Sequence, residues 1–176
     1  SAFDNMFMET NVEVMVRQAD IADTSLSAID ERSADKIAAL GQVKSTSGII
    51  FSAVMLPESS LFFIIQGYSP SELAIQRFKI VEGKSLTSNH QIMLGRMIAG
   101  SLKKKVGDTI ELSGIRYRIC GIYESKVSWE EMGGVITLRD GQILTGRPRK
   151  VTLLGVKLQD PKQAQAVVDR INQAFP

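Results

Sequence analysis

The sequence predicts an α+β fold in which helices pack on a sheet. Near the N-terminus, valines alternate with other residues as they do in a strand. Near the C-terminus, a strand pattern runs directly into a helix pattern. Between them, two alternating segments flank a two-residue turn, which is typical of a β-hairpin. The 176 residues can bury a sizeable core in one domain or in two small subdomains.

Composition and charge exclude several classes of protein. The net charge is only +2, and Lys103–Lys105 are the only basic residues in a row of three, so the chain lacks the basic stripe of a nucleic-acid-binding protein. The single cysteine excludes an internal disulfide. No apolar run approaches the ~18 residues that a membrane span needs, and no signal peptide is visible. We expect this polypeptide to be soluble.

The first residues contain an apolar cluster of Phe3, Met6, Phe7 and Met8. The cluster is typical of the end of a helix that core contacts hold in place, or of a membrane helix where it leaves the bilayer. The alternation of valine with other residues over 12–17 then predicts a half-buried strand.

A helix is predicted from about Asp30 to Leu40. Asp30 can act as its N-cap, and Ile29 and Ala34 have the spacing of a hydrophobic staple. Gly41 is a candidate for the C-cap. The residues between them present one apolar face to a core.

Two strands are predicted after this helix, over 43–54 and 61–66, with a turn around residues 57–60. The run from Leu61 to Ile65 is apolar on both faces. We expect it to be a central strand that is covered on two sides, or on one side with a partner on the other.

The stretch from Ile92 to Tyr123 predicts a strand, a short helix and a hairpin. Ile92 and Leu94 share one face of the strand, and Gly95 lets the chain leave it. The helix carries its apolar residues, Met97, Ile98 and Leu102, at helical spacing and is expected to end by Gly107 and Asp108. Strands over 109–112 and 115–119 flank Ser113 and Gly114, which form the two-residue turn.

The C-terminal part predicts a second strand–helix–strand unit and a closing helix. A short strand over 133–137 is followed by a helix that Thr137 caps and that stops at Gly146 and Pro148. Leu154–Leu158 form a strand, and Asp160 begins the last helix, with Pro161 and Gln163 placed as in a capping box. When the strands and helix between residues 71 and 128 are set aside, the order βαββαβ predicts a ferredoxin-like layer of helices on a sheet.

The ordered series from Ile92 to Tyr123 resembles the extracytoplasmic domain of MacB-type, FtsX-like ABC transporter permeases. Its parts are an apolar strand, LG, a short helix with an alanine, KVGD, an alternating strand, SG, and a strand ending in GIY. In that family the series marks a small β-rich insert, called the Sabre subdomain, that hangs from a porter subdomain. The resemblance implies a Sabre-like insert over residues 71–128 and a discontinuous porter-like subdomain over 1–70 and 129–176.

The resemblance also implies the cellular setting. Such a domain lies outside the cytoplasm, or in the periplasm of a Gram-negative cell, and is tied to the membrane by flanking helices. Its partners are a second permease copy and a cytoplasmic ATPase, with a periplasmic adaptor or envelope protein as a further candidate. The domain looks compact beside exporters that dock an adaptor, so we do not assume a tripartite pump.

Two functions follow from the resemblance. The first is mechanotransmission, in which ATP-driven motion of the membrane helices is relayed to substrate handling outside the membrane. The alternative is a lipid-, lipoprotein- or protein-binding module that docks or activates an envelope partner. An exposed apolar groove between the subdomains would favour the alternative.

The sequence nominates no catalytic, cofactor-binding or metal-binding residue. His90 lies in a polar turn with no nucleophile or acid nearby, and Cys120 lies within a strand, where a buried, inert thiol is expected. A structural zinc site needs four Cys or His ligands, and the chain has two such residues. Gly133 and Gly134 lack the spacing and the lysine of a phosphate-binding loop. We expect a non-enzymatic domain, with ATP hydrolysed by another domain or subunit.

Four residues are candidate partner contacts. Trp129 and Met132 follow the predicted insert, where a lone tryptophan is usually a packing anchor but is also typical of an interface hot spot. Arg147 and Arg149 flank Pro148 in a connection that is either solvated or in contact with an adaptor or with the second protomer.

Overall fold

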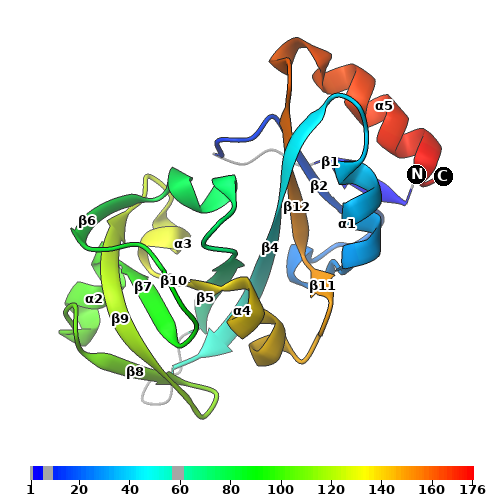
Figure 1. The fold of residues 1–176 in the computed structure, drawn as a ribbon. Coiled ribbons are helices and arrows are strands. Elements are labelled where there is room, and N and C mark those ends of the chain that lie inside the picture. Colours follow the sequence, from blue (N-terminus) through cyan, green and yellow to red (C-terminus); the bar gives the residue numbers. More distant parts are fainter. Residues whose placement is uncertain (1, 6–9, 57–61) are drawn as a thin grey trace.

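The computed structural model describes residues 2–5, 10–56 and 62–176, which fold as two lobes joined by one long strand (Figure 1). The described strands are β1 (Phe3–Asn5), β2 (Val14–Gln18), β3 (Ile29–Asp30), β4 (Val43–Met55), β5 (Phe62–Tyr68), β6 (Lys79–Gly83), β7 (Gln91–Gly95), β8 (Thr109–Leu112), β9 (Ile115–Glu124), β10 (Gly134–Thr137), β11 (Lys150–Val151) and β12 (Leu153–Leu158). The α-helices are α1 (Glu31–Ala38), α2 (Arg96–Leu102), α3 (Ser128–Glu131), α4 (Leu138–Thr145) and α5 (Ala164–Ala174). Short 3-10 helices are η1 (Thr24–Leu26), η2 (Leu73–Arg77) and η3 (Pro161–Gln163).

One mixed sheet runs through both lobes in the order β1-β2-β12-β4-β5-β10-β7-β9-β6, with β8 added beside β9. Strands β11 and β3 form a separate small sheet. The pairs β5–β10 and β7–β9 are parallel, and the other pairs of the large sheet are antiparallel. Strand β4 is the link between the lobes, because its first half pairs with β12 and its second half pairs with β5.

The lobe that holds both ends of the described chain, here called the terminal lobe, packs α1 and α5 on β2, β12 and the start of β4 (Figure 1). Its core contains Val14, Val16, Ile29, Ile37, Val43, Val151, Leu154, Val156, Leu158, Val167 and Ile171. The predicted apolar faces of β12 and α5 are confirmed, since Leu154, Val156, Val167 and Ile171 are all buried there. The two chain ends meet at this lobe, where Ala2 N donates to Phe175 O at 2.8 Å.

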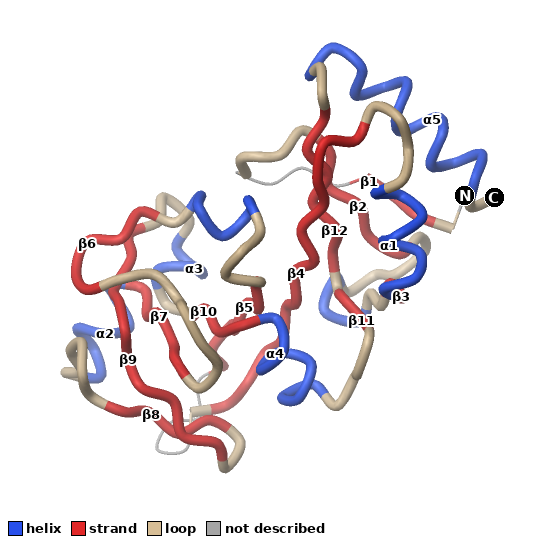
Figure 2. Tube along the Cα trace, viewed as in Figure 1, coloured by secondary structure: helices blue, strands red, loops and turns tan. Residues whose placement is uncertain are grey.

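The other lobe, here called the distal lobe, is built from the second half of β4, from β5 to β10, and from α2 and α3 (Figure 2). Its core contains Val54, Leu56, Phe63, Ile65, Ile92, Leu94, Ile98, Ala99, Ile110, Leu112, Tyr117, Ile119, Ile122 and Ile136. A third cluster lies on the opposite side of the sheet and includes residues of both lobes, from Met15 and Leu153 to Met93 and Tyr123. This shared core packs the lobes against each other.

The predicted α+β class and element order are confirmed. Strands β2 and β4 are parallel, are linked by α1, and have β12 between them, which is a split βαβ arrangement. The strand between β2 and β4 is thus β12, the last strand of the chain. In a regular ferredoxin-like sheet, the third strand of the βαββαβ order, which is β5 here, would lie in that place. Strand β5 instead continues the sheet into the distal lobe, where β10 adds to its far side. The subdomain boundaries at residues 71 and 128 stay a prediction.

Several local signals are confirmed. Asp30 caps α1 by accepting a hydrogen bond from Arg32 N, and Thr137 caps α4 by accepting from Asp140 N. Gly146 ends α4 in the left-handed conformation with a φ of 65°. Ser113 and Gly114 both have positive φ, at 50° and 79°, so they form the primed turn that the hairpin of β8 and β9 requires.

Five local expectations were wrong. Phe3 belongs to strand β1, which pairs with β2, and not to a helix; Met6, Phe7 and Met8 lie outside the described residues. Strand β2 buries Met15 as well as the valines, because the shared core covers its second face. Helix α1 ends at Ala38 and its C-cap is Ala39, which has a right-handed conformation, so Gly41 is not the C-cap.

The other two wrong expectations concern α2 and the last helix. Helix α2 ends five residues before Gly107, because Lys103 takes the left-handed conformation, and Met97 is 52% exposed on its outer face. At the last helix, Asp160 caps the 3-10 turn η3, accepting from Lys162 N, and α5 starts only at Ala164. The turn expected around residues 57–60 lies outside the described residues.

Candidate functional site

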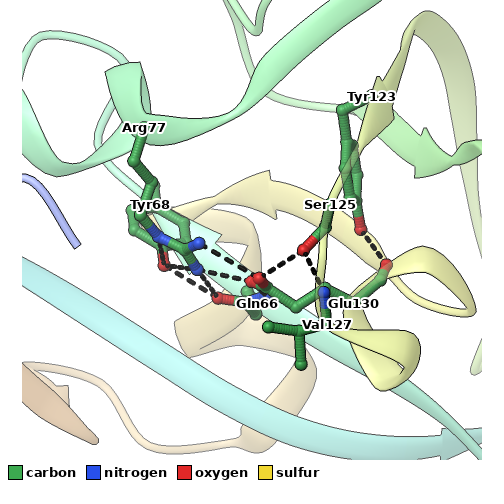
Figure 3. A network of polar contacts seen from close by, with 7 residues as sticks. All are labelled: Gln66, Tyr68, Arg77, Tyr123, Ser125, Val127 and Glu130. Atoms are coloured by element: carbon green, nitrogen blue, oxygen red, sulfur yellow. Dashed lines mark hydrogen bonds and ion pairs between the residues drawn. The ribbon is translucent and has the colours of Figure 1, made fainter. Parts of the chain in front are cut away.

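A buried polar network joins the two points where the chain enters and leaves the predicted insert (Figure 3). Arg77 ends η2 on the entry side, and Glu130 lies in α3 on the exit side. Gln66 and Tyr68 come from the central strand β5 and lie between them. We call these four residues the clamp.

The guanidinium of Arg77 is the centre of the clamp. It forms an ion pair with Glu130, with Nη1 donating to Oε1 at 3.1 Å. Its Nη2 also donates to Tyr68 Oη at 2.9 Å and to Gln66 Oε1 at 3.0 Å. Gln66 Nε2 donates to Glu130 Oε2 at 2.6 Å, and Tyr68 Oη donates to Gln66 Oε1 at 2.7 Å. Every member therefore contacts at least two others.

The chain around the clamp supports Glu130 from its other side. Ser125 Oγ donates to Glu130 Oε1 at 2.9 Å, and Tyr123 Oη donates to the Glu130 carbonyl at 2.7 Å. The Arg77 guanidinium also lies over the ring of Phe78, 4.2 Å from its centroid, which is a cation–π contact. These contacts tie η2, β5, β9 and α3 together.

The clamp is charged although it is buried. Burial alone would raise the pKa of Glu130, but the hydrogen bonds and positive charge of Arg77 outweigh it, so the pKa of this carboxyl lies below its usual value. Burial raises the pKa of Tyr68 to about 12, which keeps its hydroxyl a hydrogen-bond donor. The side chains of Arg77 and Glu130 are only 9% and 3% exposed, so this pair differs from the solvated ion pairs of the surface.

Sequence reasoning missed the clamp. Its one visible signal was Gln66, a polar residue within an otherwise apolar central strand, which must find a partner when it is buried. Nothing local marks Arg77 or Glu130 as partners, because 53 residues separate them.

Beside the clamp lies an open cleft with a volume of about 380 Å³. Its lining is mainly charged and polar: Thr10, Asn11, Arg77, Phe78, Lys79, Arg96, Glu124, Ser125, Lys126, Glu130 and Glu131. Glu124 pairs with Arg96 at 2.6 Å and with Lys79 at 3.3 Å, so most charges of the cleft are already balanced within it. No described residues form a cluster of His, Cys, Asp and Glu that could hold a metal ion.

The four residues nominated as partner contacts lie in two places. Trp129, on α3, is 40% exposed and packs against Phe51 of β4, with ring centroids 5.5 Å apart. Met132 packs against the core of the distal lobe. Arg147 follows α4, where its N–H donates to Gln142 O at 3.1 Å and closes the end of the helix. Arg149 is exposed, and its carbonyl accepts from Glu31 N at 3.0 Å.

His90 lies in a turn as predicted, whereas Cys120 is less buried than expected. His90 is exposed in a turn with a φ of 64°, and its backbone N–H donates to Asp140 Oδ2 at 2.6 Å. Cys120 is half-buried in β9, and burial raises the pKa of its thiol. A thiol with a raised pKa is a weak nucleophile at neutral pH.

Solved structures of other transporter and permease domains share this fold. The extracellular domain of the noncanonical ABC-type transporter YknZ from Gram-positive bacteria matches with a TM-score of 0.67 at 10% identity, covering 84% of both chains. The periplasmic region of MacB from Actinobacillus actinomycetemcomitans matches with a TM-score of 0.68 at 12% identity, covering 90% of this chain and 76% of that chain. A domain of a putative permease from Porphyromonas gingivalis matches with a TM-score of 0.53 at 12% identity, covering 92% and 75%. The fold is that of extracytoplasmic permease domains.

The family follows from the sequence itself. Residues 1–174 match the family of MacB-like periplasmic core domains, and the chain belongs to that family. It is therefore an extracytoplasmic domain of a membrane-anchored, MacB-like ABC transporter permease. Comparison with curated proteins finds no match. Among the described helices, none is both long enough and apolar enough to cross a membrane.

Proposed function

We propose that this domain is a mechanical relay of the transporter. A cytoplasmic ATPase drives the membrane helices of a permease dimer, and the domain converts that motion into substrate handling outside the membrane. The domain itself performs no chemistry in this proposal, and hydrolysis belongs to a separate nucleotide-binding domain or subunit.

The observation that carries the proposal is the joining of the first and last elements in the terminal lobe. Besides the backbone bond of Ala2 to Phe175, the rings of Phe3 and Phe175 lie 4.9 Å apart, and β1 is paired with β2. Force applied at either end therefore acts on one packed unit. Motion of flanking helices would rotate such a unit as a rigid body.

The connection between the lobes supports the same proposal. Strand β4 passes through both lobes without a break, and the shared core packs on it. The clamp adds a buried ion pair where the predicted insert joins the rest of the domain. A relay needs such stiffness, because a flexible junction would absorb the motion.

The alternative, a lipid- or lipoprotein-binding module, requires an apolar groove. The cleft beside the clamp is lined mainly by charged and polar side chains, so it does not support a lipid ligand. A protein partner with a polar surface is compatible with the cleft, but no observation favours this alternative over the relay.

Spin-label distances in the full-length permease with its ATPase test the relay. We would label Glu111→Cys in the distal lobe and Gln165→Cys in the terminal lobe, both exposed, in a Cys120→Ala background. We expect distances between the two copies to change between the nucleotide-free state and the vanadate-trapped ATP state. The distance between the two labels within one copy should stay constant, because the domain moves as a unit. Unchanged distances between copies would refute the relay.

A further inference from the structure

We propose that the cleft beside the clamp binds an oxyanion, which is the carboxylate or the phosphate of a small polar molecule. The inference does not depend on the relay, because it concerns binding at one site and not motion of the domain. It assigns three cationic side chains of the cleft, Lys79, Arg96 and Lys126, as the ligand contacts.

The cleft has the size of a small-molecule site, and its walls come from distant parts of the chain. Its volume of about 380 Å³ falls within the range of roughly 300–1,000 Å³ that is usual for such sites. One wall is the segment that precedes β2, which is tied to η2 because Asn11 Nδ2 donates to Leu73 O at 2.8 Å. The other walls are the start of β6, the start of α2 and the connection from β9 to α3 (Figure 1). Folding alone therefore forms this cleft.

Two of the acidic side chains that line the cleft are buried and already have partners. Glu130 is neutralised by Arg77 in the clamp. The carboxylate of Glu131, which is only 7% exposed, accepts from Ser125 N at 3.0 Å and from Met97 N at 3.4 Å. These two carboxylates therefore leave little negative charge for a ligand to meet.

The cationic side chains of the cleft are instead accessible. The side chains of Lys79 and Arg96 are 76% and 60% exposed, and Lys126 is exposed too. Lys79 and Arg96 share a single carboxylate, that of Glu124, at 3.3 Å and 2.6 Å. Lys126 has no ion pair with any described residue. Three accessible cations thus face one accessible carboxylate, so the electrostatic potential in the cleft is positive and attracts anions.

Arg96 keeps a free hydrogen-bond donor for an oxyanion. Its Nη1 donates to Glu124 Oε1 at 2.6 Å, whereas its Nη2 lies 3.8 Å from Glu131 Oε1, which is too far for a hydrogen bond. A guanidinium binds carboxylates and phosphates through paired N–H groups, and both oxyanions supply the acceptors. The ammonium groups of Lys79 and Lys126 add further donors from the neighbouring walls.

The backbone holds the cations in place before a ligand arrives. Lys79 and Glu124 are cross-strand partners where β6 begins and β9 ends. Arg96 is the first residue of α2 and directly follows β7, which pairs with β9. Such preorganisation lowers the entropy that binding costs.

Other classes of ligand fit the cleft less well. A cation would meet three accessible like charges. An acyl chain would find one aromatic side chain in the lining, Phe78, and the guanidinium of Arg77 already lies over its ring. The chemistry of the lining therefore favours a small oxyanion.

Protection of lysines from acetylation tests the site in the full-length permease with its ATPase. Acetic anhydride would be applied in the nucleotide-free state with increasing concentrations of tricarballylate, a tricarboxylate, or of inorganic phosphate, and mass spectrometry would read each lysine separately. Lys44 is the internal control, because it is exposed on β4 and does not line the cleft. We expect at least one probe to slow the acetylation of Lys79 and Lys126 by about three-fold or more and to leave Lys44 unchanged.

Two substitutions should shift the binding in opposite directions. Arg96→Met removes the guanidinium and should raise the probe concentration for half-maximal protection at least about ten-fold. Glu124→Gln keeps the size of the side chain but frees two cations, and it should lower that concentration at least about three-fold. Arg116→Met is the matched control, because Arg116 is exposed on β9 outside the cleft.

The two probes separate the two sources of an oxyanion. Protection by tricarballylate alone would assign the ligand to the carboxylates, and protection by phosphate alone would assign it to the phosphates. The proposal is overturned if neither probe protects Lys79 and Lys126, or if Lys44 is protected equally. It is also overturned if Arg96→Met and Arg116→Met behave alike, because the protection would then come from general screening by the added anion.

Discussion

Removal of Arg77 should weaken the domain more than removal of any surface arginine. In Arg77→Met, the carboxylate of Glu130 stays buried and loses its counter-ion, while Gln66 and Tyr68 each lose a donor. Breaking a buried pair in this way costs about 3–5 kcal/mol of unfolding free energy. For a domain of this length, each kcal/mol corresponds to about 2–4 °C, so the Tm should fall by roughly 6–20 °C.

Thermal and urea unfolding of the domain would measure this loss. Arg116→Met is the matched control, because Arg116 is exposed on β9 and its replacement should change stability by less than about 0.5 kcal/mol. The double variant Arg77→Met with Glu130→Gln should be more stable than Arg77→Met alone, since it removes the uncompensated charge. A loss below about 1 kcal/mol in Arg77→Met, or no recovery in the double variant, would refute the view that the clamp is an energetic link.

Two further predictions concern pH and close packing. Because the pKa of Glu130 is lowered in the folded state, its contribution to stability is present above the ordinary value of 4.5 and is lost as the pH falls through the folded pKa. In the Arg77→Met variant the Glu130 carboxyl is buried without a counter-ion and gains from protonation. In urea unfolding, the stability lost relative to the unchanged domain should therefore become smaller as the pH falls, and a loss that does not vary with pH would contradict this. Gly95→Ala should destabilise by about 1–3 kcal/mol, because its Cβ would lie 2.2 Å from the Glu131 carbonyl oxygen. Gly100→Ala in the same helix region meets nothing within 4 Å and should instead stabilise by about 0.5–1 kcal/mol, so equal effects of the two changes on Tm would contradict the packing.

Local sequence determined the elements of this protein and their caps. Asp30, Thr137 and Gly146 are recognisable because a cap depends on neighbouring residues alone. The hairpin turn at Ser113 and Gly114 is recognisable for the same reason. The ordered series of such signals was also enough to reveal the resemblance to MacB-type permeases, because related domains can share the order of their elements even where their individual residues differ.

The tertiary structure alone decided which strands are neighbours and which charges are paired. Periodicity shows that a strand is buried but not which strand lies beside it, so the sequence could not place β12 between β2 and β4. The clamp forms only because folding brings Arg77 and Glu130 together from distant parts of the chain. Strand β4 likewise changes its partner from β12 to β5 at Ile49, and such a change is visible only once the strands are paired.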